Sequence, residues 1–173
     1  FNLGTSTLEL AIVQDSTSAD TYVGLEASLT DAGLIGITDL TLVASGAVKV
    51  NEGGLDWTAV TGSGNAIEGV DLDIEETVVF AASGQAALDA FGVLVASGSF
   101  NLELLTGIAI DDGVTAPFTA DVLTLTATVN GFAGIGPSLS DATSSATPVL
   151  TDAIGFNLGT STLELAIVQD STS

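Results

Sequence analysis

The sequence contains no cysteine, no histidine and no methionine, and its only basic residue is Lys49. The absence of cysteine excludes disulfides and thiolate metal sites. Because histidine is absent, no Ser–His–Asp arrangement can activate a nucleophile, and Lys49 lies in the middle of a predicted strand. The acidic residues are scattered, and no pair of them is singled out for acid–base chemistry. We therefore predict that the chain is not an enzyme.

Acidic residues number 22, which gives the chain a formal net charge of -21. Nucleic acid is excluded as a partner because phosphate backbones are bound by rows of cations. An anionic membrane surface is disfavoured for the same reason. No apolar run reaches the ~18 residues of a membrane-spanning helix, so no membrane insertion is expected. The acidity has two interpretations, a solvated surface in a salty medium or the binding of divalent cations such as Ca²⁺.

Large aromatic residues are few, with one Trp, one Tyr and seven Phe, although 46% of the residues are hydrophobic. Small apolar side chains and threonine carry the hydrophobicity instead. Such a composition suits thin, closely stacked β-layers better than a deep core built around aromatic anchors.

One segment occurs twice without a change, because Phe1 to Ser18 and Phe156 to Ser173 both read FNLGTSTLELAIVQDSTS. The difference between the two starting positions, 156 minus 1, is a period of 155 residues. A tandem array cut at more than one period produces such a duplication. We therefore expect residues 1–155 to be one full repeat and residues 156–173 to be the start of the next, within a longer protein.

Apolar residues alternate with other residues through much of the chain, as they do in half-buried strands. In Thr7 to Gln14, for example, Leu8, Leu10 and Ile12 share one face. The pattern predicts further strands at 21–29, 39–51, 77–83, 93–105 and 121–129. Between them we expect a short helical turn at 84–91 and connections at 52–76, 106–120 and 130–151.

The strand predicted at 39–51 has Gly46 in the middle of its apolar row, which indicates a bulge or the close approach of another layer. The phrase VASG at Val43–Gly46 recurs at Val95–Gly98, 52 positions later (95 minus 43). This echo indicates that one repeat holds three pairs of strands. Runs that are apolar on both sides, such as Leu42 to Ala44, predict a sheet covered on both faces and favour lateral assembly.

Five acidic residues are candidate metal ligands. Asp71, Asp73 and Glu75 would share one face of an extended strand, where like charges are costly unless they are solvated or bridged by a cation. Asp111 and Asp112 precede a glycine and read either as a turn or as a ligand pair. A solvated edge is the alternative for the first group. No cofactor is required by the sequence, and Ca²⁺ is the one candidate.

Trp57 is the only tryptophan and lies in the long connection at 52–76. It is interpreted either as a plug over the end of a sheet or as a platform that stacks on a sugar.

The repeated segment, the VASG phrases and the phrase LDWT at Leu55 to Thr58 together make the chain resemble the tandem repeats of giant secreted or surface-displayed bacterial proteins, of the filament or adhesin type. This resemblance implies an extracellular or cell-surface location and a structural or adhesive role. It carries over no catalytic residue.

We predict an all-β fold of long, mostly antiparallel strands in an elongated tandem-repeat assembly, with a β-solenoid or β-sandwich beads as alternatives. Each repeat is expected to be completed by a neighbouring repeat or by another copy of the chain, because a strand at the boundary of a unit exposes its hydrogen-bonding edge. The expected function is that of a structural repeat unit of a self-assembling extracellular filament, sheath or surface stalk. The alternative is an adhesin repeat that binds a receptor or glycan, stabilised by calcium.

Overall fold

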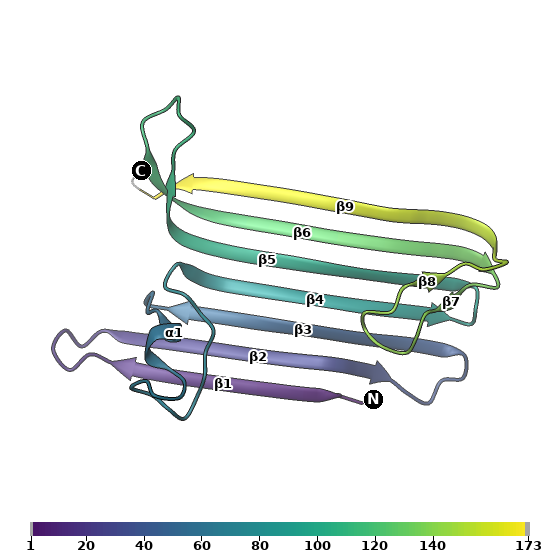
Figure 1. Ribbon diagram of the computed structural model, residues 1–173, viewed down its shortest axis with the longest axis horizontal. Helices are drawn as coiled ribbons and strands as arrows, with labels where there is room; N and C mark the ends of the chain where they lie inside the picture. The colour runs from purple at the N-terminus through teal and green to yellow at the C-terminus, as the bar shows by residue number, and fades with distance from the viewer. Residues whose placement is uncertain (1, 172–173) are drawn as a thin grey trace.

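A computed structural model describes residues 2–171, so Phe1, Thr172 and Ser173 of the repeated segments lie outside the described residues. Its main feature is one antiparallel sheet of seven strands in the order β1-β2-β3-β4-β5-β6-β9 (Figure 1). The prediction of an all-β fold with long antiparallel strands is therefore confirmed. The strands are β1 (Thr5–Gln14), β2 (Thr21–Leu34), β3 (Leu40–Glu52), β4 (Val78–Ala90), β5 (Leu94–Ile110), β6 (Phe118–Ile135) and β9 (Ile154–Asp170).

Neighbours in the sequence are neighbours in the sheet as far as β6. The connections between them are short, except that residues 53–77 join β3 to β4. At the first turn the Asp15 carboxylate accepts the backbone N–H of Thr17 at 2.6 Å, and Ala19 adopts a φ of 64°. The helical turn expected at 84–91 is wrong, because these residues belong to β4 and its turn into β5. Their alternation of small side chains fits a strand between two others, and this packing decides the conformation over local propensity.

Two loops cross the same face of the sheet, which we call the loop face (Figure 1). The first loop, 53–77, contains the single helical turn α1 (Trp57–Val60) and lies across β1 to β3. The second loop, 136–153, contains the short strands β7 (Ser138–Leu139) and β8 (Pro148–Val149), which pair with each other and contact β4, β5 and β6. The middle of the loop face lies between these two covers.

Successive side chains of a strand alternate between the two faces, so the register assigns each residue to one of them. Lys49 contacts the first loop and Ser45 the second, which places the odd-numbered residues of β3 on the loop face. Across the register, the loop face of β4, β5 and β6 is mostly Ser, Thr, Asn, Gln and Ala. The even-numbered residues of β3 and their partners are nearly all apolar, and we call their side of the sheet the apolar face.

The most deeply buried cluster lies between the first loop and one end of the sheet, and its members are Ala11, Trp57, Leu72 and Ile74. Trp57 is fully buried, and its indole N–H donates to the Asn51 side-chain oxygen at 3.0 Å. The interpretation of Trp57 as a plug over the sheet is confirmed. Because none of its surface is exposed, the indole offers no face to a sugar.

Two other expectations need correction. Within the described residues the seven long strands form a single-layer meander and no solenoid is present; the second sheet there is the two-stranded pair of β7 and β8. The bulge expected at Gly46 lies instead on the partner strand, between Leu29 and Ala32, since Asp31 takes a φ of 51° there. Both loops cross the loop face, where Val43 and Val95 are buried, so one copy covers only this face by itself, and cover of the other face stays a prediction.

The contact between Gly24 and Trp57 generates a test of the plug. A Cβ atom at Gly24 would stand 2.6 Å from Trp57 Cε2, whereas one at Gly33 on the same strand would meet nothing closer than 3.7 Å. We expect Gly24→Ala to lower the free energy of unfolding by about 2 kcal/mol through overpacking, and Gly33→Ala to change it much less. Urea unfolding followed by the fluorescence of Trp57 measures both. Equal effects of the two substitutions would contradict the plug.

Candidate functional site

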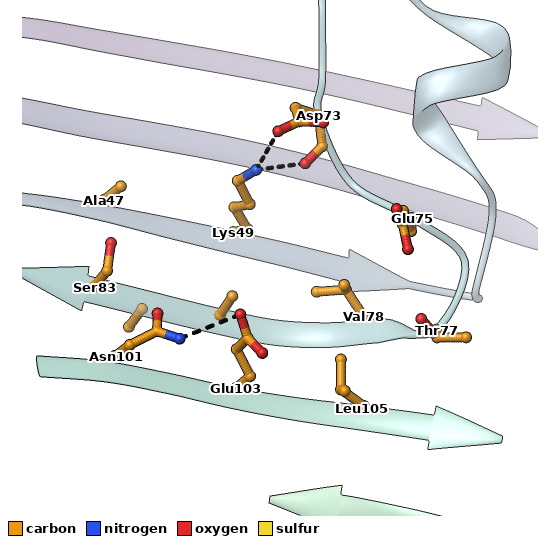
Figure 2. Close-up of a pocket in the computed structure, with 12 residues that line it drawn as sticks. Ala47, Lys49, Asp73, Glu75, Thr77, Val78, Ser83, Asn101, Glu103 and Leu105 are labelled. Carbon is orange, nitrogen blue, oxygen red and sulfur yellow. Dashed lines mark hydrogen bonds and ion pairs between the residues drawn. The ribbon is translucent and has the colours of Figure 1, made fainter. Parts of the chain in front are cut away.

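A shallow groove on the loop face lies between the first loop and β5 (Figure 2). Lys49 stands at its centre, and its ammonium group lies 3.0 Å from a carboxylate oxygen of Asp73 and 3.8 Å from one of Glu26. Farther along the groove the Asn101 amide donates to Glu103 at 3.3 Å. Lys49 therefore forms ion pairs with two carboxylates, one on the first loop and one on β2.

The segment from Asp71 to Glu75 alternates as expected, although it is an irregular strap and not a strand. Leu72 and Ile74 are buried in one cluster with Trp57, while Asp71, Asp73 and Glu75 are exposed. The strap is held to the sheet by two carboxylates, since the Asp71 N–H donates to Glu9 at 3.2 Å and the Asp73 N–H donates to Glu26 at 3.1 Å. This arrangement explains the alternation of the strap without a metal ion.

Asp111 and Asp112 lie in the turn between β5 and β6, on a different element from the strap. The Asp111 carboxylate accepts the N–H of Gly113 at 2.9 Å. The Asp112 carboxylate accepts the N–H groups of Thr115 and Val114, and these bonds hold its pKa below the usual value. Among the described residues no three acidic side chains are grouped as metal ligands. Calcium binding at the five candidate residues stays a prediction.

Lys49 links the strap to the sheet, which can be tested by removing its charge. We expect Lys49→Gln to leave Glu26 and Asp73 without their shared cation and to lower the free energy of unfolding by about 1 kcal/mol. Hydrogen exchange should accelerate at the strap amides of Asp71 and Asp73. Glu103→Gln, a charge change in the same groove away from the strap, is the control. Unchanged exchange at the strap in Lys49→Gln would refute this role.

The second loop is fastened to the sheet by Asp31, the left-handed residue of the bulge in β2. Its carboxylate accepts the N–H of Ser144 at 2.9 Å, and the Ser144 hydroxyl lies 2.6 Å from that of Ser45. The Gln85 amide donates to Ser144 at 3.2 Å. The Ser144 N–H, followed by the Ser144 and Ser45 hydroxyls, holds the pKa of Asp31 below its ordinary value.

The lowered pKa of Asp31 gives this fastening a defined pH dependence. Its contribution is present above the ordinary value of 3.8 and is lost as the pH falls through the lower pKa of the folded state. In an NMR titration from about pH 5 to about pH 2, we expect the Ser144 amide to shift with a midpoint below 3.8. Asp31→Asn should abolish this step, and Asp141→Asn, in the same loop, should keep it. A midpoint at or above 3.8 would contradict the assignment.

The repeated segment supplies both edge strands of the sheet, β1 and β9. Both copies have the same local conformation. Gly4 and Gly159 have φ values of 63° and 66°. The Asn2 side chain accepts the N–H of Gly4 at 3.0 Å, and the Asn157 side chain accepts the N–H of Gly159 at 2.8 Å. The two strands run in the same direction in Figure 1.

The two copies bond to their neighbours through opposite backbone edges. In β1 the Asp15 N–H donates to Asp20 at 2.9 Å, and in β9 the Ser171 N–H donates to Thr119 at 3.0 Å. Because alternate residues of a strand direct their backbone groups to opposite sides, the odd-numbered residues of Thr5–Gln14 face β2, and those of the equivalent stretch, 160–169, face β6. Before Gly4 this alternation is interrupted, since Asn2 also bonds to Gly33 of β2. Because the period of 155 is odd, each odd-numbered residue of β9 is equivalent to an even-numbered residue of β1. The two copies therefore bond through different positions of the repeated segment. Ala11 faces β2, whereas its equivalent Ala166 faces away from β6.

On the loop face, side chains of β1 pack against the first loop, whereas the equivalent side chains of β9 are exposed. Ala11 is 7% exposed, and Val13 packs against the cluster around Trp57. Their equivalents in β9 are open, with Ala166 exposed and Val168 48% exposed. Strand β9 therefore lacks on its outer side what β1 has, namely a neighbour equivalent to β2 and a first loop. The duplication is visible in the sequence, but this complementarity is not, because the direction of the backbone hydrogen bonds depends on the register.

No family model, curated protein or solved structure matches the chain. Among residues 2–171 no helix has the length and apolar character needed to cross a membrane.

Proposed function

We propose that the chain is a structural, non-catalytic repeat unit of an extracellular filament, sheath or surface stalk, and that successive repeats form one continuous sheet. In this arrangement β9 is also the first strand of the following repeat. It pairs with β6 through one edge and with the next repeat's equivalent of β2 through the other. The extracellular location follows from the resemblance to giant surface-displayed repeat proteins.

The observation that carries the proposal is the complementary use of the repeated segment by β1 and β9. A strand in the middle of a sheet needs partners on both sides, and over Thr5–Gln14 and its equivalent stretch the two copies together use both sides. Direction, side-chain facing and backbone conformation agree as well. Placing β9 on β1 of a following repeat therefore requires no change in register.

Cover on the loop face supports the same arrangement. The first loop of the following repeat would lie over β9 as it lies over β1 here, and would bury Ala166 and Val168 beneath its tryptophan. Glu164 would then accept the strap N–H that Glu9 accepts from Asp71 in this copy at 3.2 Å. Each joint would thus reproduce the buried cluster that is already present at β1.

A chain of two periods tests the joint. Each period adds six strands, β1 to β6, which at a spacing of about 4.8 Å lengthen the sheet by about 29 Å. Electron microscopy and small-angle scattering should find a single rigid body longer by this amount. Two sheets that move independently on a flexible link would overturn the proposal and favour the adhesin alternative, in which separate units present their loops to a receptor.

Proline substitutions at equivalent positions of the two copies test whether the outer edge of β9 is hydrogen-bonded in the two-period chain. In the present chain the Ala166 N–H points away from β6, so Ala166→Pro should change stability little. Ala11→Pro, the same change in the other copy, removes an N–H bonded to β2 and should cost about 2 kcal/mol. In the two-period chain Ala166→Pro should become as costly as Ala11→Pro, as measured by urea unfolding. A tolerated Ala166→Pro there would contradict a shared strand.

A further inference from the structure

We propose that the apolar face of the sheet packs against the apolar face of a second copy of the chain, to form a two-layer sandwich. This inference concerns a surface that the shared strand does not use, and it does not rest on that joint. Neither loop crosses the apolar face in Figure 1, and many of its large side chains are exposed to solvent. The large exposed ones are Leu8, Leu10, Ile12, Leu42, Val48, Leu94, Phe100, Val129, Leu163, Leu165 and Ile167.

The size of this face exceeds what a soluble monomer ordinarily exposes. Seven strands spaced about 4.8 Å apart span about 34 Å, and the stretch from Leu42 to Val50 spans about 30 Å along a strand, which gives about 1,000 Å². Contiguous apolar patches on monomers are usually about 300–600 Å². Two such faces would bury about 2,000 Å² together, at the upper end of the range for stable protein interfaces.

The distribution of charge selects a second copy as the occupant. The chain carries a net charge of -21, so two copies repel each other wherever their acidic loops meet. On the apolar face the charged strand residues are Glu52 and Asp121, and both stand near strand ends at its rim. Two apolar faces can therefore meet without negative charges facing each other across the middle of the contact. An anionic membrane would be repelled by the rest of the chain.

The apolar face has a ridge and a hollow that would fit those of a second copy related by a two-fold axis. Gly46, Gly84 and Phe100 stand side by side on β3, β4 and β5. The Phe100 ring lies over Gly84, where a Cβ atom would be 2.7 Å from it, so Phe100 is a ridge beside a hollow at Gly46. Leu29, Val48 and Ala82 also line this hollow.

Strand β4 is the middle strand of the seven. A two-fold axis parallel to β4 overlays all seven strands of both copies and brings each β5 over the partner's β3. The Phe100 ridge of one copy then enters the Gly46 hollow of the other. The two sheets would lie about 10 Å apart, as in β-sandwiches. Figure 1 shows the strands nearly parallel across the sheet, which suits stacking over its full width.

The test compares two lysine substitutions on opposite faces of β6. Val129 is 47% exposed on the apolar face, and Thr126 is exposed on the loop face. Sedimentation of the full chain should give a dimer that tightens as salt rises, because salt screens the acidic loops. Val129→Lys should weaken the dimer about 100-fold or more, since it would bury an unpaired charge. Thr126→Lys should leave the dimer intact.

Both lysines make the chain less negative, so added repulsion cannot explain a loss of association in Val129→Lys. The fluorescence of Trp57 and the circular dichroism of the sheet report whether each variant is folded, and Leu163→Lys on β9 is a second interface variant. A wild-type chain that stays monomeric at high salt, or a folded Val129→Lys that dimerises like the wild type, would overturn the inference. So would a monomeric chain that binds phosphatidylcholine vesicles through Val129.

Two further variants test the two-fold placement and distinguish face-to-face packing from association through strand edges. Phe100→Ala should weaken the dimer about tenfold by emptying the Gly46 hollow, and an unchanged dimer would overturn the two-fold placement. Ala166→Pro disturbs only the outer edge of β9 and should leave the face-to-face dimer intact. A dimer lost in Ala166→Pro and kept in Val129→Lys would show that the copies join by their edges and that the apolar face is not their contact.

Discussion

The constraint on which this structure depends is that the backbone hydrogen bonds of each strand must be completed by its neighbours. The sheet is a single layer with few fully buried side chains, so the hydrogen-bonded ladder between strands carries a larger share of its order than in a globular domain. Two edges and one apolar face remain without a partner in one copy. The proposed joint and the proposed sandwich each supply one of these missing neighbours.

The near absence of cations changes what the carboxylates do. In most proteins many acidic side chains pair with lysine or arginine, but here Lys49 alone is available and serves both Glu26 and Asp73. Several other carboxylates accept N–H and hydroxyl groups of the chain itself, as Asp31 does from Ser144. These bonds fix turns and fasten the two loops, and they lower the pKa of several aspartates. The acidic surface is therefore part of the architecture as well as a source of repulsion.

The chain also illustrates how one segment can serve two positions. A strand has two backbone edges and two side-chain faces. Equivalent residues of β1 and β9 lie on the same face of the sheet, but the two strands bond to their neighbours through opposite edges. An even period would have given both copies the same bonded positions, and the two could not be merged into one central strand. The odd period of 155 residues is thus a geometric condition for the proposed continuity.

The sequence by itself determined the strand class, the duplication and the apolar rows, because the period-two alternation of Leu8, Leu10 and Ile12 reports a half-buried strand without tertiary information. It also placed Asp71, Asp73 and Glu75 on one face and gave the plug as one of two interpretations of Trp57. Only the tertiary structure decided that 84–90 belong to a strand, that both loops cross one face, and which edge each copy uses. These features depend on register and on contacts such as Asp31 with Ser144, 113 residues apart, which no local pattern encodes.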